Sequence, residues 1–278
     1  MQNLIGWLHK NRWQNIAVAS VYFLLVVLPH EIVGRFIMND LLSGFSRSRL
    51  NSTVLVISLL AFSTFLFFLL RNLIRGDQKG IKLIYLFITL GFMILVYKYL
   101  FVLATESAHF PQYALLAIIL FPLTLNYSAT LFWATLLGAI DEAYQYFYLN
   151  PTATGYFDFN DVITDLLGAV LGLLLLWSFG IKEKIQTVPW YKRRTIQTGL
   201  GILLVGGILN LFQVISIYPN GESSKAIITL MNNAPKSFWS YDKVGDLYFH
   251  VVHPIEGILI ISALFGIYSF LGKSEKSG

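Results

Sequence analysis

The chain has no cysteine and few charged residues. Of its 278 residues, 13% are charged and 56% are hydrophobic, whereas a typical soluble domain is about 25% charged. Without cysteine there can be no disulfide, no thiolate nucleophile and no thiolate metal ligand. This small number of charges could not cover the surface of a folded globule of this length. The composition therefore excludes a soluble enzyme.

The hydrophobic residues occur in runs of about 20, which is the length of a helix that crosses a bilayer. We therefore predict an all-α, polytopic integral membrane protein that forms a single membrane domain over residues 1–278, because no Gly- or Ser-rich linker divides the chain. The first run follows Lys10 and Arg12 and has no small-residue cleavage site after it, so we interpret it as an uncleaved span. Eight spans are predicted, at about residues 14–33, 53–70, 81–104, 111–126, 128–148, 161–179, 196–217 and 251–271.

The lysines and arginines flank these runs and are divided unequally between the two sides of the membrane. With the N-terminus inside, thirteen of them lie on the inner side and six on the outer side, and the densest clusters, 71–82 and 182–194, are both inside. Because positive residues are enriched in cytoplasmic loops, we expect both termini to be cytoplasmic. The lysines and arginines that give the net charge of +5 are then expected to set the topology and to contact membrane lipids. They do not indicate a nucleic-acid partner.

Most acidic residues and four of the five histidines fall at the outer ends of the predicted spans. These residues come from five places in the chain: His30 and Glu31; Glu106 and His109; Asp141 and Glu142, with Gln145 beside them; Asp158, Asp161 and Asp165; and Asp246, His250, His253 and Glu256. An ionisable residue inside a span costs roughly 2.5–3.5 kcal/mol on insertion scales, so it marks a candidate functional site. This collection at one membrane face is the strongest functional signal in the sequence.

Helical spacing groups part of this set into one stripe. Asp158, Asp161 and Asp165 fall on one face of a helix, and Gly168 and Gly172 continue that face below them. Glycines at this spacing let another helix approach closely, so the acids above them are expected to face protein rather than lipid. The first two aspartates also fit a helix N-cap and a first-turn acid, but this reading leaves Asp165 unexplained.

The acids of two neighbouring spans are expected to meet. If residues 128–148 and 161–179 form an antiparallel hairpin, the acids at 141–142 lie beside the aspartates that begin the second helix. Crowded carboxyl groups raise one another's pKa and can share protons, bind a cation or serve as acid and base. We assign candidate catalytic roles to Asp141, Glu142, Asp161 and Asp165, and candidate binding roles to His109, Tyr113, Gln145 and Asp158.

Four elements in this region resemble the VanZ-like family, over residues 98–178. They are His109-Phe110-Pro111-Gln112-Tyr113, Asp141-Glu142-Ala143-Tyr144-Gln145, Phe157-Asp158-Phe159-Asn160-Asp161-Val162 and Gly168-Ala169-Val170-Leu171-Gly172. The chain departs from the family pattern in two ways, because 149–156 contain no basic residue and an aspartate stands at 165, where the family tends to have asparagine. The resemblance implies a membrane protein of the bacterial cell envelope that acts on an amphiphilic, lipid-linked or lipoglycopeptide molecule, as in low-level resistance to the antibiotic teicoplanin.

The sequence also leaves three alternatives open. The segment His250-Val251-Val252-His253-Pro254-Ile255-Glu256 carries imidazole and carboxylate groups loosely on one helix face, which suits a divalent metal such as zinc and predicts an intramembrane hydrolase or transferase. The same residues also fit a helix start with a proline in its first turn. A proton-coupled transporter, in which the 158–165 stripe relays protons, is the second alternative, and a structural scaffold is a third.

A long outer loop is predicted at 218–250, and it is rich in aromatic residues. Tyrosine and tryptophan are enriched at membrane–water interfaces, so these side chains are expected to anchor the loop at the bilayer surface. Because loops of this length are often functional, a lipid-binding lid is the other interpretation.

Overall fold

The computed structural model describes residues 2–36, 47–149, 155–184, 188–219, 226–231, 234–235, 237–242 and 247–273. The described chain is predominantly helical, as the composition predicts, with four short strands between residues 215 and 249. The helical elements are α1 (Gln2–Lys10), α2 (Arg12–Tyr22), η1 (Phe23–Val27), α3 (His30–Phe36), α4 (Arg47–Arg75), α5 (Lys79–Tyr99), η3 (Ala104–Ala108), α6 (His109–Thr124), α7 (Tyr127–Tyr144), η4 (Gln145–Leu149), α8 (Phe159–Ser178), η5 (Trp190–Lys192), α9 (Arg194–Leu211) and α10 (Pro254–Tyr268).

Six helical segments are long and apolar enough to cross a membrane. They are Arg12–Gly34, Asn51–Arg75, Lys79–Tyr99, Ala104–Thr124, Phe159–Ser178 and Arg194–Leu211, and they correspond to six of the eight predicted spans. The other two predicted spans, 128–148 and 251–271, coincide with α7 and α10, which fall outside this set; α10 has only 15 residues. The length and composition of the helices therefore indicate a multi-pass membrane protein.

Helix α8 lies at the centre of the helix bundle and is buried along most of its length. Glycines allow this close packing. A Cβ at Gly168 would lie 2.7 Å from the carbonyl oxygen of Phe110, and one at Gly172 would collide with the carbonyl oxygen of Ala114. The predicted Gly-x-x-x-Gly face is therefore the surface against which α6 packs, at a separation that a side chain would prevent.

The predicted seventh span is shorter than expected. Helix α9 ends at Leu211 instead of continuing to residue 217, because Gln213 takes a left-handed conformation (φ 55°) that breaks the helix, and a strand follows. None of the residues of α9 is buried. The helix touches the bundle where Gly199 faces the ring of Phe132, and otherwise presents its apolar side chains outward.

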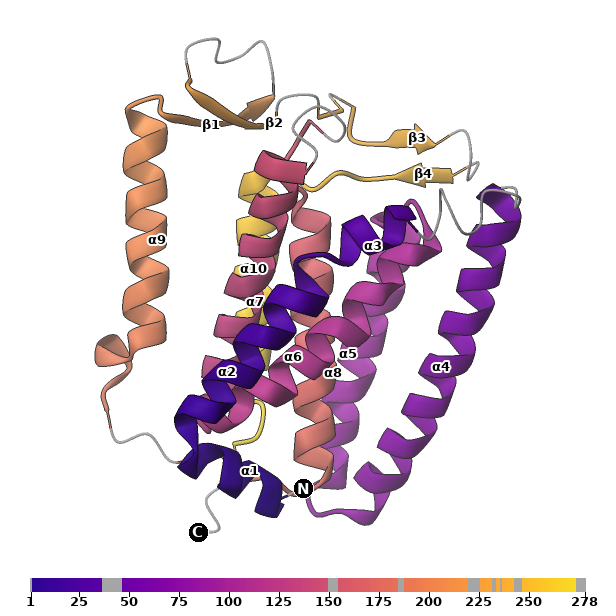
Figure 1. Ribbon diagram of the computed structural model, residues 1–278, viewed down its shortest axis with the longest axis vertical. Coiled ribbons are helices and arrows are strands. Elements are labelled where there is room, and N and C mark those ends of the chain that lie inside the picture. The colour runs from indigo at the N-terminus through magenta and orange to yellow at the C-terminus, as the bar shows by residue number, and fades with distance from the viewer. Residues whose placement is uncertain are drawn as a thin grey trace.

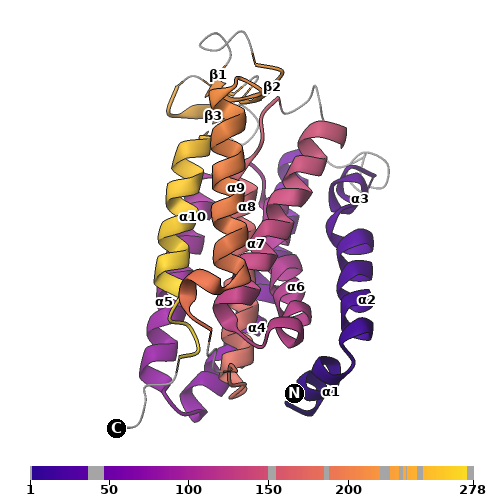
Figure 2. The same cartoon turned by 90° about the vertical axis from the view of Figure 1, so that its left-hand side faces the viewer.

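Strands occupy the segment that was predicted as a loop. Strand β1 (Ile215–Pro219) pairs in parallel with β2 (Ile228–Met231), and β3 (Ser240–Asp242) pairs antiparallel with β4 (Leu247–Phe249). All four strands gather at one end of the bundle, which we call the strand end (Figure 1). Helix α1 lies at the opposite end, where α10 also finishes, so α10 runs from the strand end to the end that holds α1 (Figures 1 and 2).

Candidate functional site

The acids of α7 and α8 meet at the strand end. Asp158 caps α8, since its carboxylate Oδ1 accepts a hydrogen bond of 2.8 Å from the backbone N–H of Asn160. The backbone N–H of Asp158 in turn donates to Oε1 of Glu142, also at 2.8 Å. The two acidic groups therefore come together as the hairpin hypothesis predicts, with a backbone amide forming the link between them.

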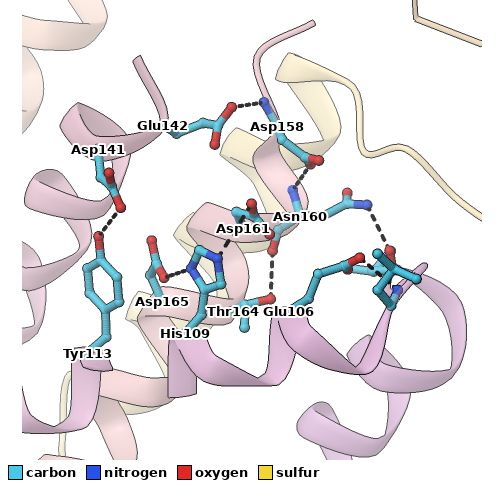
Figure 3. Close-up of polar contacts among 12 residues, drawn as sticks. Glu106, His109, Tyr113, Asp141, Glu142, Asp158, Asn160, Asp161, Thr164 and Asp165 are labelled. Carbon is cyan, nitrogen blue, oxygen red and sulfur yellow. Dashed lines mark hydrogen bonds and ion pairs between the residues drawn. The ribbon is translucent and has the colours of Figure 1, made fainter. Parts of the chain in front are cut away.

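His109 joins α6 to this group. It is the first residue of α6, and its imidazole is buried between two aspartates of α8. The ring Nδ1 lies 2.8 Å from Oδ1 of Asp165, and Nε2 lies 3.7 Å from Oδ2 of Asp161 (Figure 3). Because Asp161 and Asp165 are one helical turn apart, they hold the ring from both of its nitrogen sides.

Tyr113 adds a phenol to the cluster, one turn further along α6. Its hydroxyl donates a hydrogen bond of 3.2 Å to Oδ2 of Asp141 on α7 (Figure 3), and its ring lies nearly parallel to that of His109. The side chain of Asp165 packs over Gly138 of α7, where a Cβ would lie 2.5 Å from Oδ2. Three helices thus contribute to one compact group of polar side chains, which we call the acidic cluster: His109, Tyr113, Asp141, Glu142, Asp158, Asp161 and Asp165.

The members of the acidic cluster differ in their exposure. Asp141 and Asp165 are each 1% exposed and Glu142 is also buried, whereas Asp158 and Asp161 are only partly buried. Asp158 lies directly before the membrane-spanning part of α8. Burial and the neighbouring charge of Asp161 raise the pKa of Asp158 to about 7. A carboxyl group with such a pKa can give or take a proton near neutral pH.

Three further residues surround the cluster that sequence reasoning did not assign to the site. Asn160 uses both ends of its amide: its Nδ2 donates to the carbonyl oxygens of Leu100 (3.2 Å) and His250 (2.9 Å), and its Oδ1 accepts from the N–H of Val252 (2.9 Å). This residue fastens the start of α8 to two distant segments. An asparagine two residues after an N-cap gives no signal of this in the sequence.

Tyr156 and Glu106 are the other two. Burial and the charges of Asp158 and Asp161 raise the pKa of the Tyr156 phenol, so Tyr156 interacts electrostatically with the acidic cluster. The carboxylate of Glu106 accepts hydrogen bonds from the backbone N–H groups of Val102 and Leu103. Glu106 was recognised in the sequence as an outer acid, and its contacts show that it caps η3.

Among the predicted catalytic and binding residues, Gln145 is the one that the described contacts do not join to the cluster. It is buried at the start of η4, directly after α7. The side chains of His30 and Glu31, and the whole of Asp246, lie outside the described residues, as do 150–154 of the predicted loop.

The predicted metal ligands occupy the start of α10. His250 places Nδ1 2.7 Å from the carbonyl oxygen of Phe238 and Nε2 3.0 Å from Oε2 of Glu256, while His253 donates its backbone N–H to that same Oε2 at 3.0 Å. Glu256 therefore caps the helix start, as the second interpretation of the segment holds. Within the described part of the chain, no three His, Asp or Glu side chains are grouped so that they could hold a metal ion.

Comparisons of the chain with the models of known protein families, with curated proteins and with solved structures find no match. The resemblance to the VanZ-like family therefore rests on the residues quoted above.

Proposed function

We propose that this chain is a VanZ-like membrane protein of the cell envelope that binds an amphiphilic, lipid-linked or lipoglycopeptide molecule at its acidic cluster. The observation that carries the proposal is the pairing of His109 with both Asp161 and Asp165, in a group to which α6, α7 and α8 all contribute. Buried charges are retained only where they are paired or used. Two carboxyl groups that share one imidazole favour the uptake of a proton or of a cationic group on the ligand.

We further propose eight crossings, with both termini in the cytoplasm and the strand end outside. Lys10 ends α1, Arg12 and Lys79 begin α2 and α5, and Lys182 and Lys273 follow the ends of α8 and α10; these helix ends lie opposite the strands. The acidic cluster lies at the strand end, away from these lysines and arginines. The positive-inside rule then supports an acidic cluster that faces the outer leaflet.

The structure offers less support for a metal-dependent enzyme and for a proton-coupled transporter. A metal-dependent hydrolase or transferase would use His250, His253 and Glu256, but the contact of His253 with Glu256 is made by a backbone amide. A proton-coupled transporter would need a path from Asp165 to the opposite end. Beyond Asp165, α8 has no ionisable residue as far as Ser178.

Drug susceptibility tests the proposed function. The chain would be expressed in a teicoplanin-sensitive Gram-positive host, beside Asp161→Asn and the matched control Asp77→Asn, and protection against teicoplanin would be compared with protection against vancomycin. Asp161 is the partly exposed acid at His109, whereas Asp77 is exposed between α4 and α5. We expect protection against teicoplanin that Asp161→Asn abolishes and Asp77→Asn preserves.

Two results would contradict the proposal. Absence of protection, with the protein verified in the membrane, would remove the role implied by the family resemblance. Protection that survives Asp161→Asn would separate that role from the acidic cluster.

A further inference from the structure

The β3–β4 hairpin presents an exposed aromatic surface. Tyr241 and Tyr248 lie directly opposite each other in the antiparallel register, with ring centroids 5.1 Å apart. They are 48% and 64% exposed, although a cross-strand aromatic pair is usually half-buried in a sheet. These two rings are therefore exposed enough to contact a surface outside the chain.

The same face of the hairpin continues to the end of a membrane-spanning helix. Trp239 directly precedes β3 and His250 directly follows β4. The alternation of side chains along each strand, continued by one residue, puts Trp239 on the face of Tyr241 and His250 on that of Tyr248. The ring of Trp239 lies 6.2 Å from that of His250 and 5.7 Å from that of Tyr99, measured between centroids. Tyr99 is the last residue of α5, and its carbonyl oxygen accepts the N–H of His250 at 2.7 Å.

The hairpin is therefore held at the level where the spans end. Figure 1 shows β3 and β4 running across the helix axes, beside the end of α4. A membrane-spanning helix leaves the hydrocarbon core at this level and enters the headgroup region. The aromatic face thus lies at the depth where tyrosine and tryptophan are enriched in membrane proteins.

The surface of α5 that leads to the hairpin has the character of a lipid-facing stripe. Leu95, one turn before Tyr99, is exposed on a helix that crosses the membrane. Lys98 directs its ammonium group over the ring of Tyr99, 4.9 Å from the centroid. An apolar stripe that ends in an aromatic ring with a lysine above it is typical of a helix at the bilayer surface.

We infer that the β3–β4 hairpin is a membrane-surface element, whose aromatic face, Trp239, Tyr241 and Tyr248, lies in the lipid headgroup region of the leaflet at the strand end. The partner is the bilayer itself, because the face continues the lipid-exposed stripe of α5. The hairpin thereby fixes the depth of the strand end, including Asn160 at the start of α8, which hydrogen-bonds the carbonyl oxygen of His250. The inference does not depend on the proposed function.

Site-directed spin labelling tests this depth, and the chain suits the method because it has no cysteine. Tyr241→Cys and Tyr248→Cys would each be labelled in the full-length protein, reconstituted in vesicles of phosphatidylcholine and phosphatidylglycerol. Two control positions calibrate the scale: Leu60→Cys, exposed in the middle of α4, and Ile227→Cys, 82% exposed beside β2. Collisions with oxygen and with a water-soluble nickel complex would be measured at each position.

The expected result is a nickel collision rate at 241 and 248 that is several-fold below the rate at 227, with an oxygen-to-nickel ratio between those at 227 and 60. Nickel collisions at both tyrosine positions as frequent as at 227 would overturn the inference, because the face would then lie in water. Dipolar broadening at 241 that disappears on dilution with unlabelled protein would also overturn it, since a second copy of the chain would then cover the face. Labelling at either tyrosine position suffices if the other variant does not fold.

Discussion

Asp158 combines two functions in one side chain. It accepts the hydrogen bond that caps α8, and it belongs to a group of acids that raises its pKa to about 7. A capping carboxylate usually prefers to be charged, because the helix dipole and the amide donors stabilise the negative form. The opposite shift at Asp158 shows that burial and the charge of Asp161 outweigh the cap.

This shift predicts how stability depends on pH. Because the pKa is higher in the folded than in the unfolded protein, the folded state binds more protons between about pH 4 and 7. Stability should therefore fall as the pH rises through that range, by at most about 1.4 kcal/mol per pH unit from this residue. Asp158→Asn removes the titration but keeps a good N-cap, so its melting temperature should depend less steeply on pH between 5 and 7.

Asp77→Asn supplies the matched control for this measurement. It makes the same chemical change at an exposed acid at the opposite end of the bundle, so its pH profile should follow that of the unmodified chain. A profile for Asp158→Asn that is as steep as that of the control would show that Asp158 does not carry the proton.

The residues of the site could be predicted only where the helical period determines their position. Spacing alone placed Asp161 and Asp165 on one stripe of α8, and both do contact His109. The contacts of Asn160 could not be found in this way, because its partners at Leu100, His250 and Val252 are distant in sequence. Tertiary contacts of this kind depend on how the helices and loops pack against one another. The helical periodicity of the sequence does not encode this packing.

At the scale of elements, the helices were predictable and the strands were not. Runs of apolar residues locate the spans because each must satisfy a fixed bilayer thickness. The strands contain three to five residues each, too few for an alternating pattern to stand out. Strand β2 is also held by groups far away in sequence, since the N–H of Phe157 donates to Leu230 and the hydroxyl of Tyr146 to Thr229.

The packing of α6 on α8 gives a prediction at this scale. A Cβ at Gly172 would collide with the backbone of Ala114, which cannot rotate away as a side-chain end could. Gly172→Ala should therefore push the two helices apart and lower the melting temperature of the purified protein, with a cost of about 1–3 kcal/mol typical of overpacking. The acidic cluster would be disturbed as well, because His109 and Asp165 lie on these two helices.

Gly91→Ala on α5 is the matched control, since a Cβ there meets no atom within 4 Å. Alanine favours a helix over glycine by up to about 1 kcal/mol, so this variant should melt at the same temperature or slightly higher. Equal melting temperatures for the two variants would show that α6 and α8 are not in close contact at Gly172.

The whole molecule has two chemically different ends, and this asymmetry predicts its orientation. The acidic cluster and the strands occupy one end, and α1 with the α4–α5 turn occupies the other (Figure 1). Because the chain has no cysteine, a single introduced cysteine reports on one end alone. With the strand end outside, a membrane-impermeant maleimide added to intact cells should label Ile227→Cys at the strand end. It should label Asp77→Cys, in the α4–α5 turn, only after the membrane is permeabilised. The reverse pattern would place the acidic cluster in the cytoplasmic half of the bilayer, where it could not receive a molecule from the outer leaflet. Labelling of both positions in intact cells would contradict the odd number of crossings between them and the shared side of the termini.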